Sequence, residues 1–413
     1  PLVIVTVGLP ARGKSYLAHR LSRHCNWIGI EAKDFVSISY GMHKVAMGSM
    51  GAVDIYEPHT DDNGEGNWAE LFGDIFADVQ EYVTRPDASC VAIMDMYCCT
   101  RNFRMFVFEQ LRKFVDEDRI IFLELVLDDG LCEGMVREKA RTSPEYRGLP
   151  EEQALAGIRA QIELYKKHYA PVDDEYAFIR VINNRRHTIN RIKGFLPSRI
   201  ATWVLQAQVG RVHHPVYFFP VPEHTFLLED RFGGNPSLTA NGIADAQRLF
   251  NYISRQLGPE ELEVWTSGLT RSIQVGQLFE DAGYKTKQWI ALNEVHTGVC
   301  EGLTRQEVTE RYPFITDLRN TDKYAFRFPH GESYLDMIAR LERVILCLER
   351  TERPVLIIGH RAPIRELFSY FYEAPAEEVV HLRLPPQRVW KYQVSSSRYP
   401  RITAIHLGDA NLG

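Results

Sequence analysis

The chain has 413 residues, of which 45% are hydrophobic and 25% are charged, and its formal net charge at pH 7 is −6. This length predicts two or three domains, and the composition is typical of a globular protein. The negative charge gives no electrostatic reason to expect nucleic acid or an anionic membrane as a partner, and no stretch approaches the roughly 20 apolar residues that span a bilayer.

The first predicted elements form a phosphate-binding motif. A buried strand is predicted over residues 2–7, and a helical run follows over residues 16–24, with Gly8-Leu9-Pro10-Ala11-Arg12-Gly13-Lys14-Ser15 between them. This loop has the pattern G-x-x-x-x-G-K-[ST], in which main-chain N–H groups approach nucleotide phosphates at a helix N-terminus. Lys14 would reach the β- and γ-phosphates, and the Ser15 hydroxyl would ligate Mg²⁺. A chance match in a glycine-rich turn is the alternative, which the order of strand, loop and helix disfavours.

The rest of the first half alternates strands and helices. Strands are predicted over 33–39, 90–95, 119–127 and 178–182, helices over 68–83, 101–115, 130–140 and 151–169, and residues 190–205 close the unit. This alternation predicts a mainly parallel sheet covered by helices on both faces. Asp95 ends an apolar strand, where a second carboxylate organises the metal of a nucleotide site, although a helix-capping aspartate is the alternative. Other basic residues that would meet phosphate, each otherwise a solvated surface charge, are Arg12, Arg101, Arg104, Lys139 and Arg141.

A second series of α/β elements follows a change in composition at residues 206–215. Its strands are predicted near 216–219, 262–266, 288–292 and 354–359, and its helices near 241–257, 270–282, 333–350 and 362–371. We place the boundary at about residue 210, which gives domains of residues 1–209 and 210–413. The two halves carry different motifs, and neither repeats the other.

The seven cysteines have no regular spacing, which argues against a disulfide framework and for a reducing, cytoplasmic compartment. No cysteine or histidine grouping has zinc spacing, and we interpret His213-His214 as part of a solvated connector rather than a metal site. Because the first residue already belongs to the predicted core strand, we expect that the chain was trimmed or lacks its natural start, and that any targeting signal is unreadable.

The first half resembles a known kinase domain. The segment from Val7 to Tyr16, followed by Asn26-Trp27-Ile28-Gly29, is similar to the kinase domain of the 6-phosphofructo-2-kinase/fructose-2,6-bisphosphatase family. This family fuses a P-loop kinase to an α/β histidine-phosphatase-like (phosphoglycerate-mutase-like) domain, and the resemblance extends over nearly the whole chain. It implies ATP and Mg²⁺ bound by Gly8, Ala11, Arg12, Gly13, Lys14, Ser15, Tyr16 and Asp95. It also implies a catalytic lysine at Lys139, ahead of Ser143-Pro144-Glu145-Tyr146, and a sugar-phosphate contact at Tyr165.

Several positions depart from the family pattern. Paired arginines are expected after Tyr40, where Gly41 and Met42 stand, and further arginines are expected where Gln161 and Phe103 stand. After Asp95 the family reads Ala-Thr-Asn-Thr-Thr-Arg, whereas this chain reads Met96-Tyr97-Cys98-Cys99-Thr100-Arg101. Each lost charge-assisted contact costs about 1.5–3 kcal/mol, so three losses would weaken sugar-phosphate binding by several powers of ten. Either neighbouring cations compensate, namely Arg101, Arg104, Arg137 and Arg159, or the phosphoryl acceptor differs.

The second half resembles the bisphosphatase domain of the same family. The similar segments are Val264-Trp265-Thr266-Ser267, residues 291–294, 298–301, 322–324 and 329–334, and Ile358-Gly359-His360-Arg361-Ala362. The family uses a histidine nucleophile in an Arg-His-Gly-Glu loop after the first strand. Here that loop reads Pro220-Val221-Pro222-Glu223-His224, so a valine takes the place of the nucleophile and the prolines fix φ near −65°. We therefore expect no hydrolysis, with substitution by His224 in a rearranged loop as the alternative.

Other positions that face substrate in the family keep polar side chains. They are Arg231, Arg271, Glu294, Arg319, Lys323, His360, Arg361 and Arg365, of which Arg361 replaces a family glutamine. Two interpretations stay open. The pocket holds a phosphorylated ligand without cleaving it, or these residues are inherited and have no present ligand.

The leading functional hypothesis is transfer of the γ-phosphoryl group of MgATP to a sugar phosphate, most simply fructose 6-phosphate. The alternative is an inactive protein that binds nucleotide or sugar phosphate in a regulatory or structural role. The expected partners are ATP and a sugar phosphate, without nucleic acid or membrane. Whether the protein is a homodimer or a subunit of a larger assembly stays open.

Overall fold

The computed structural model describes residues 1–37, 39–40, 68–86, 89–143, 146–209, 214–393 and 401–408. The chain divides into two compact units, Pro1–Arg211 and Val212–Gly413. Gly41, Met42, Pro144, Glu145 and His213, which the sequence analysis singled out, lie outside the described residues. No helix in the described part is long and apolar enough to cross a membrane.

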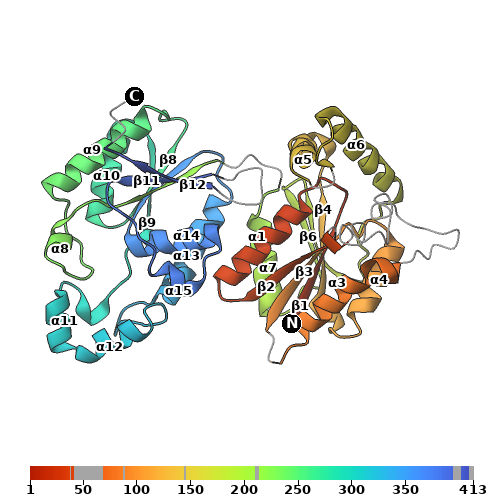
Figure 1. The fold of residues 1–413 in the computed structure, drawn as a ribbon, viewed down its shortest axis with the longest axis horizontal. Helices are drawn as coiled ribbons and strands as arrows, with labels where there is room; N and C mark the ends of the chain where they lie inside the picture. The colour runs from red at the N-terminus through yellow and green to blue at the C-terminus, as the bar shows by residue number, and fades with distance from the viewer. Residues whose placement is uncertain are drawn as a thin grey trace. The chain divides into compact units, whose positions relative to one another are not determined.

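The described part of the first unit contains a six-stranded sheet in the order β2-β3-β1-β4-β5-β6 (Figure 1). Its strands are β1 (Leu2–Val7), β2 (Glu31–Val36), β3 (Cys90–Asp95), β4 (Ile120–Val126), β5 (Ala177–Ile182) and β6 (Arg186–Asn190). Strands β1 to β5 are parallel, and β6 pairs antiparallel with β5. The central strands β1 and β3 are buried along their whole length, because helices cover both faces of a parallel sheet.

Helices on the two faces of this sheet are separate pairs (Figure 1). Helices α1 (Lys14–Trp27) and α7 (Phe195–Gln206) lie on one face, and α3 (Trp68–Val83) and α4 (Arg101–Leu111) lie on the other. Helices α5 (Asp129–Thr142) and α6 (Glu151–His168) pack against each other through a small apolar cluster. That cluster also contacts Ala11 of the loop after β1, so it places α5 and α6 beside the loop.

The second unit also has a six-stranded sheet among its described residues, in the order β12-β11-β7-β10-β8-β9. Its strands are β7 (Val216–Pro220), β8 (Glu263–Ser267), β9 (Lys285–Trp289), β10 (Val355–Gly359), β11 (Arg388–Gln393) and β12 (Arg401–His406). Strands β7 to β10 are parallel, whereas β11 is antiparallel to both β7 and β12.

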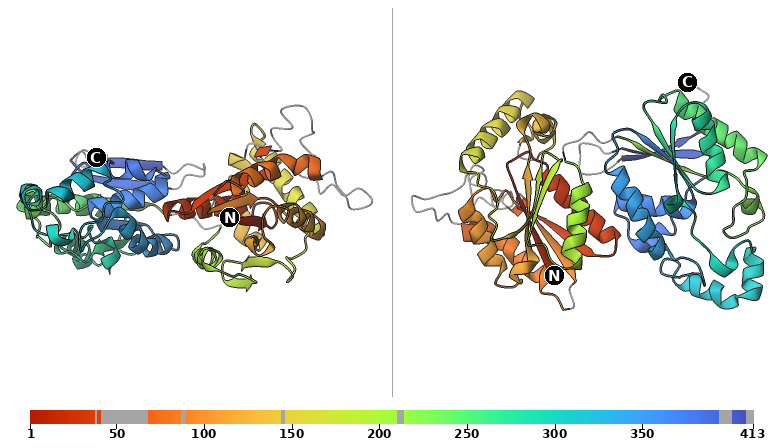
Figure 2. Two further views of the ribbon diagram at one scale, coloured as in Figure 1. Left: turned by 90° about the horizontal axis from the view of Figure 1, so that it is seen from below. Right: turned by 180° about the vertical axis from the view of Figure 1, so that it is seen from behind.

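Successive side chains of β7 point to opposite faces of this second sheet, and each face is covered by helices. Tyr217 and Phe219 pack into the cluster formed with α9 (Ala240–Ser254) and α10 (Thr270–Asp281). Phe218 points to the other face, where its ring contacts Phe368 of α14 (Arg361–Tyr372). Helix α13 (Tyr334–Leu348) packs beside α14, and the short helices α8 (Thr225–Leu228), α11 (Arg305–Arg311), α12 (Pro313–Thr321) and α15 (Ala376–Val379) complete the unit (Figure 2).

The predicted class, two α/β domains with mainly parallel sheets, is confirmed. Two details were wrong. The strand predicted over 288–292 ends at Trp289 and continues as a 3-10 turn, Ile290–Leu292. The antiparallel strands β6, β11 and β12 were missed. The closing segment 190–205, for which no element type was predicted, is the end of β6 followed by α7. Strand β12 forms the edge of its sheet and β11 lies next to it, and the partial exposure of both strands weakens the hydrophobic pattern that indicates a strand.

Candidate functional site

The loop after β1 needs glycine at two positions. Gly8 has φ 141° and Gly13 has φ 76°, values that side chains rarely adopt. A Cβ on Gly8 would lie 2.6 Å from the main-chain oxygen of Leu125, and a Cβ on Gly13 would lie 2.1 Å from Cγ1 of Val209. Helix α1 begins directly afterwards at Lys14, and the first N–H groups of a helix have no partner within it. The loop therefore fits a phosphate anion.

Lys14 is held inside this loop and is 4% exposed. Its ammonium donates a hydrogen bond of 2.7 Å to the main-chain oxygen of Leu9 and lies 4.4 Å from the centre of the Tyr97 ring. Burial lowers the pKa of Lys14 to about 8, and the nearby Asp95 carboxylate opposes that effect. At neutral pH the side chain is therefore mostly charged, as binding to a phosphate requires.

The two residues predicted to hold magnesium lie together. Asp95 ends β3, accepts a hydrogen bond from Ser15, and accepts another of 3.2 Å from the Thr6 hydroxyl. Burial raises the pKa of the Asp95 carboxyl, and the hydrogen bond from Ser15 and the charge of Lys14 oppose that rise. Helix α4 is capped by Thr100, so Asp95 is not its cap. A hydroxyl and one carboxylate fit a magnesium ion that a nucleotide brings, because such ions keep few protein ligands.

Lys139 reaches the same place from α5. Its ammonium donates a hydrogen bond of 3.2 Å to the Tyr97 hydroxyl. The ring of Tyr97 lies 5.3 Å, centre to centre, from the ring of Tyr165 on α6. The structure therefore brings Lys14, Lys139 and Tyr165 around one side chain, Tyr97. Sequence reasoning noted Tyr97 as a departure from the family pattern and assigned it no role.

Other residues predicted for this site lie elsewhere. The Arg104 side chain is 0% exposed and donates to the main-chain oxygens of Cys98, Cys99, Ala170 and Pro171. Arg104 is thus a correction, because a guanidinium committed to the chain's interior does not face a substrate.

The other arginines that the sequence analysis named in the first unit lie beside acidic side chains. Buried Arg12 pairs with Asp129, and Arg101, whose side chain is 65% exposed, lies 3.2 Å from Asp173. The surface pairs Arg137–Glu133, Arg159–Glu133 and Arg141–Glu151 have N–O distances of 3.3, 2.9 and 3.1 Å. Tyr16 stacks under Arg20, whose guanidinium carbon lies 5.0 Å from the ring centre.

The described positions that lack the expected arginines hold uncharged side chains, Phe103 and Gln161. Phe103 belongs to an aromatic cluster, with its ring centre 5.2 Å from that of Trp68 and 5.1 Å from that of Phe72. Gln161 precedes Tyr165 by one helical turn, and its Oε1 is buried without a hydrogen-bond partner among the residues that the structure describes. Neither side chain supplies positive charge for a second phosphate group.

In the second unit, the loop after β7 holds no nucleophile at the expected position. The Val221 side chain packs against the core, and its N–H donates a hydrogen bond of 2.7 Å to the oxygen of Gly359. His224 caps α8, because its Nδ1 accepts a hydrogen bond of 3.2 Å from the N–H of Leu227. Burial, and then the charges of Arg271 and Arg361, lower the pKa of His224 to about 4. The imidazole is therefore neutral with its proton on Nε2, which makes Nε2 a donor and not a nucleophile.

A buried histidine and a buried arginine lie close to His224. His360 is 1% exposed, and its Nε2 lies 2.7 Å from the Ser267 hydroxyl. Burial, and then the charge of Arg271, lowers the pKa of His360. Arg271 is 2% exposed and donates to the oxygen of Gly234 at 3.0 Å, while its Nε has no hydrogen-bond partner within the described part of the chain. A buried guanidinium with a spare donor favours an anion.

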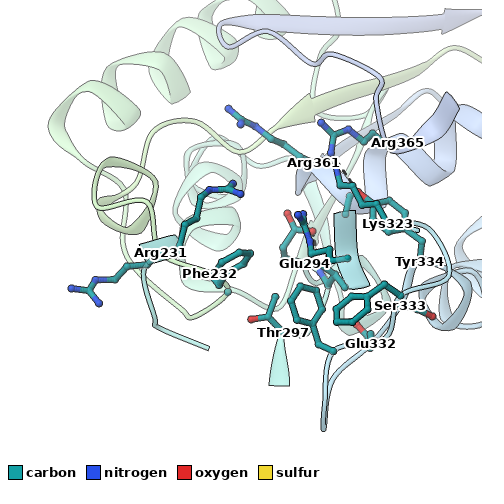
Figure 3. Close-up of a pocket in the computed structure, with 17 residues that line it drawn as sticks. Arg231, Phe232, Glu294, Thr297, Lys323, Glu332, Ser333, Tyr334, Arg361 and Arg365 are labelled. Carbon is teal, nitrogen blue, oxygen red and sulfur yellow. Dashed lines mark hydrogen bonds between the residues drawn. The ribbon is translucent and has the colours of Figure 1, made fainter. Parts of the chain in front are cut away.

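A pocket of about 280 Å³ gathers the other predicted residues of this unit (Figure 3). Figure 3 shows Lys323, Arg361 and Arg365 along one side of it, with Glu294 between them and Arg231. Arg231 is bound to Glu229 at 2.6 Å. Burial, and then the charges of Arg365, Arg319 and Arg305, lower the pKa of Lys323 to about 8. Like charges crowded in this way are relieved by a bound anion.

Two family models match the sequence. Residues 1–210 match 6-phosphofructo-2-kinase, and residues 228–404 match the histidine phosphatase superfamily (branch 1). The 6-phosphofructo-2-kinase/fructose-2,6-bisphosphatase of Gallus gallus is 34% identical over 399 residues, which are 95% of this chain and 82% of that protein. The Homo sapiens 6-phosphofructo-2-kinase/fructose-2,6-bisphosphatase 1 is 33% identical over 401 residues, which are 95% of this chain and 81% of that protein. A crystal structure of the alpha-ribazole phosphatase from Shigella flexneri covers 46% of this chain and 96% of its own, with 20% identity and a TM-score of 0.42.

Proposed function

The chain belongs to the 6-phosphofructo-2-kinase/fructose-2,6-bisphosphatase family, and from this we propose that its first domain transfers the γ-phosphoryl group of MgATP to fructose 6-phosphate. The products are ADP and fructose 2,6-bisphosphate, and one proton is released. One observation carries the proposal: a glycine-dependent phosphate loop, a Ser15–Asp95 pair and two lysines meet at the carboxyl edge of β1 and β3.

Each residue has a role that its surroundings support. The main-chain N–H groups of residues 11–15 hold the phosphates, with Ala11, Arg12 and Tyr16 as parts of the loop and of its helix. Ser15 and Asp95 hold Mg²⁺, which supplies positive charge to the transferring phosphoryl group. Lys14 neutralises charge on the nucleotide side, and Lys139 does so on the acceptor side. We propose residues 1–209 as the kinase domain.

Recognition of the acceptor is assigned to Tyr165 and Arg101. Arg101 is exposed, and its pairing with Asp173 at 3.2 Å is a surface contact that a sugar phosphate would replace at small cost. The absence of arginine at Phe103 and Gln161 is the specific observation that favours the second candidate function. In that case the domain binds nucleotide in a regulatory or structural role and does not turn over.

The second domain, residues 210–413, is proposed to hold a phosphorylated ligand without hydrolysing it. Two facts support the loss of hydrolysis: Val221 has no lone pair, and the tautomer of His224 leaves no lone pair on Nε2. The buried guanidinium of Arg271 and the crowded cations Lys323, Arg319 and Arg365 support binding of an anion. We propose a cytoplasmic location, in keeping with seven cysteines that are all thiols.

The experiment follows ATP consumption with and without fructose 6-phosphate, in wild-type protein and in Lys14→Ala. Turnover that requires the sugar and disappears in the variant supports the kinase. Thermal stabilisation by MgATP without turnover supports the second candidate. For the second domain, hydrolysis of fructose 2,6-bisphosphate would overturn the proposal, and its loss in His224→Ala would identify the nucleophile.

A further inference from the structure

The side chain of Tyr97 contacts both lysines of the proposed transfer site. Its ring lies 4.4 Å from the ammonium of Lys14, and its hydroxyl accepts a hydrogen bond of 3.2 Å from the ammonium of Lys139. Lys14 comes from the phosphate loop and Lys139 from α5, so these contacts join elements that are far apart in the sequence. One neutral side chain thus lies between the two cations.

The position of Tyr97 is fixed by its main chain and by its ring. The main-chain oxygen of Tyr97 accepts a hydrogen bond of 3.0 Å from the N–H of Gly8, which connects Tyr97 to the phosphate loop. The next residue, Cys98, has φ 43°, so the chain turns sharply there. On the side facing α6, the ring packs against Tyr165 at 5.3 Å. A side chain held in this way defines where both ammonium groups lie.

We propose that Tyr97 is a positioning residue for phosphoryl transfer, with its ring holding Lys14 on the nucleotide side and its hydroxyl holding Lys139 on the acceptor side. The inference rests on the proposed kinase function. Two ammonium groups at one site repel each other, and an acidic side chain between them would relieve the repulsion. A carboxylate would also repel the triphosphate, whereas a phenol attracts both cations through its ring face and its oxygen without adding negative charge.

The two roles reside in different atoms, so substitution separates them. Tyr97→Phe keeps the ring and removes the hydroxyl, and Tyr97→Leu removes both. Tyr146→Phe is the matched control, because the Tyr146 ring lies 5.9 Å from the same Lys139 ammonium, about the distance of the Tyr97 ring itself. Circular dichroism and thermal unfolding verify that each variant is folded.

We expect Tyr97→Phe to bind MgATP within about two-fold of wild type and to lose about 10- to 150-fold in kcat with fructose 6-phosphate, the range for one hydrogen bond to a charged group. Tyr97→Leu should also weaken MgATP binding by about three- to thirty-fold, the range for a cation–π contact. Tyr146→Phe should change neither quantity. An unchanged kcat in Tyr97→Phe, or equal loss of MgATP affinity in both Tyr97 variants, would overturn the proposal.

A second measurement separates this inference from the proposed function. MgADP with aluminium fluoride mimics a transferring phosphoryl group and needs both lysines, whereas MgADP alone needs Lys14. If wild-type protein shows no turnover that depends on fructose 6-phosphate, the proposed function fails, and this pair of ligands still tests Tyr97. Tyr97→Phe should keep the affinity for MgADP and lose about 10- to 150-fold in the affinity for the fluoride complex. Unchanged affinity for both ligands would remove Tyr97 from the site.

Discussion

Replacing Lys14 by methionine removes a buried ammonium group and keeps most of its aliphatic stem. Burial lowers the pKa of Lys14 from 10.5 to about 8, which corresponds to about 3 kcal/mol of unfavourable free energy for the charged side chain at neutral pH. The lost hydrogen bond to Leu9 and the lost contact with the Tyr97 ring offset about 2 kcal/mol of that gain. We therefore expect the unliganded first unit to become more stable by about 1 kcal/mol, or about 2 to 4 °C in its unfolding midpoint.

The same substitution should weaken MgATP binding. A charge-assisted contact contributes about 1.5–3 kcal/mol, so the dissociation constant should rise by about 10- to 150-fold. Titration calorimetry measures the affinity, and thermal unfolding with and without MgATP measures both effects in one protein. The control is Lys33→Met, because the exposed Lys33 on β2 contacts the ring of Phe35 at 4.9 Å and lies outside the proposed site. Wild-type affinity for MgATP in Lys14→Met would refute the assignment of the loop.

Three further predictions concern the loop, the core and the second domain. Gly8→Ala places a methyl group 2.6 Å from a main-chain oxygen and should abolish the thermal shift caused by MgATP. Gly29→Ala places its methyl group with no atom within 4 Å and should keep that shift. Equal shifts in the two variants would contradict the proposed phosphate loop. Arg104→Met should lower the free energy of unfolding by about 3 kcal/mol in urea titrations, because buried main-chain oxygens lose their hydrogen-bond donor. The control Arg101→Met should change the free energy of unfolding by less than about 0.5 kcal/mol. Fructose 6-phosphate should bind the second domain more weakly as pH rises from 7 to 9, because Lys323 loses its proton near pH 8. Calorimetry of Lys323→Arg should show an affinity that changes less with pH. Identical pH profiles for wild type and variant would count against binding of the phosphate by Lys323.

The phosphate loop was predictable because its chemistry is local. Gly8, Gly13, Lys14 and Ser15 lie within eight residues, and a short strand and a helix suffice to fix them. Asp95 was predictable for a related reason, since the carboxyl ends of neighbouring parallel strands meet at one edge of a sheet. Both inferences need little knowledge of tertiary packing.

Which arginine side chains are buried and which are exposed was not predictable in this way. Arg101 and Arg104 are three residues apart on α4, yet one side chain is 65% exposed and the other is fully buried. Which of them turns inward depends on main-chain oxygens at residues 170 and 171, far away in the sequence. The importance of Tyr97 depends in the same way on α5 and α6, which bring Lys139 and Tyr165 to it.

The edge strand β6 was missed for a different reason. Strand β6, Arg186–Asn190, has no apolar face, so periodicity gave no sign of it. A local signal did exist, because Asn183 and Asn184 both have positive φ and form the tight turn that joins β5 to β6. An Asn-Asn pair between two short segments is a hairpin signal that sequence reasoning overlooked.

The central claim is tested most directly by the chemical fate of the γ-phosphoryl group. Wild-type protein, MgATP and fructose 6-phosphate are incubated together, and ³¹P nuclear magnetic resonance follows the phosphorus signals. The account predicts that ADP and a sugar bisphosphate appear together, that neither forms without the sugar, and that both vanish in Lys14→Met. A protein that MgATP stabilises but whose ATP signals stay unchanged beside fructose 6-phosphate would contradict it.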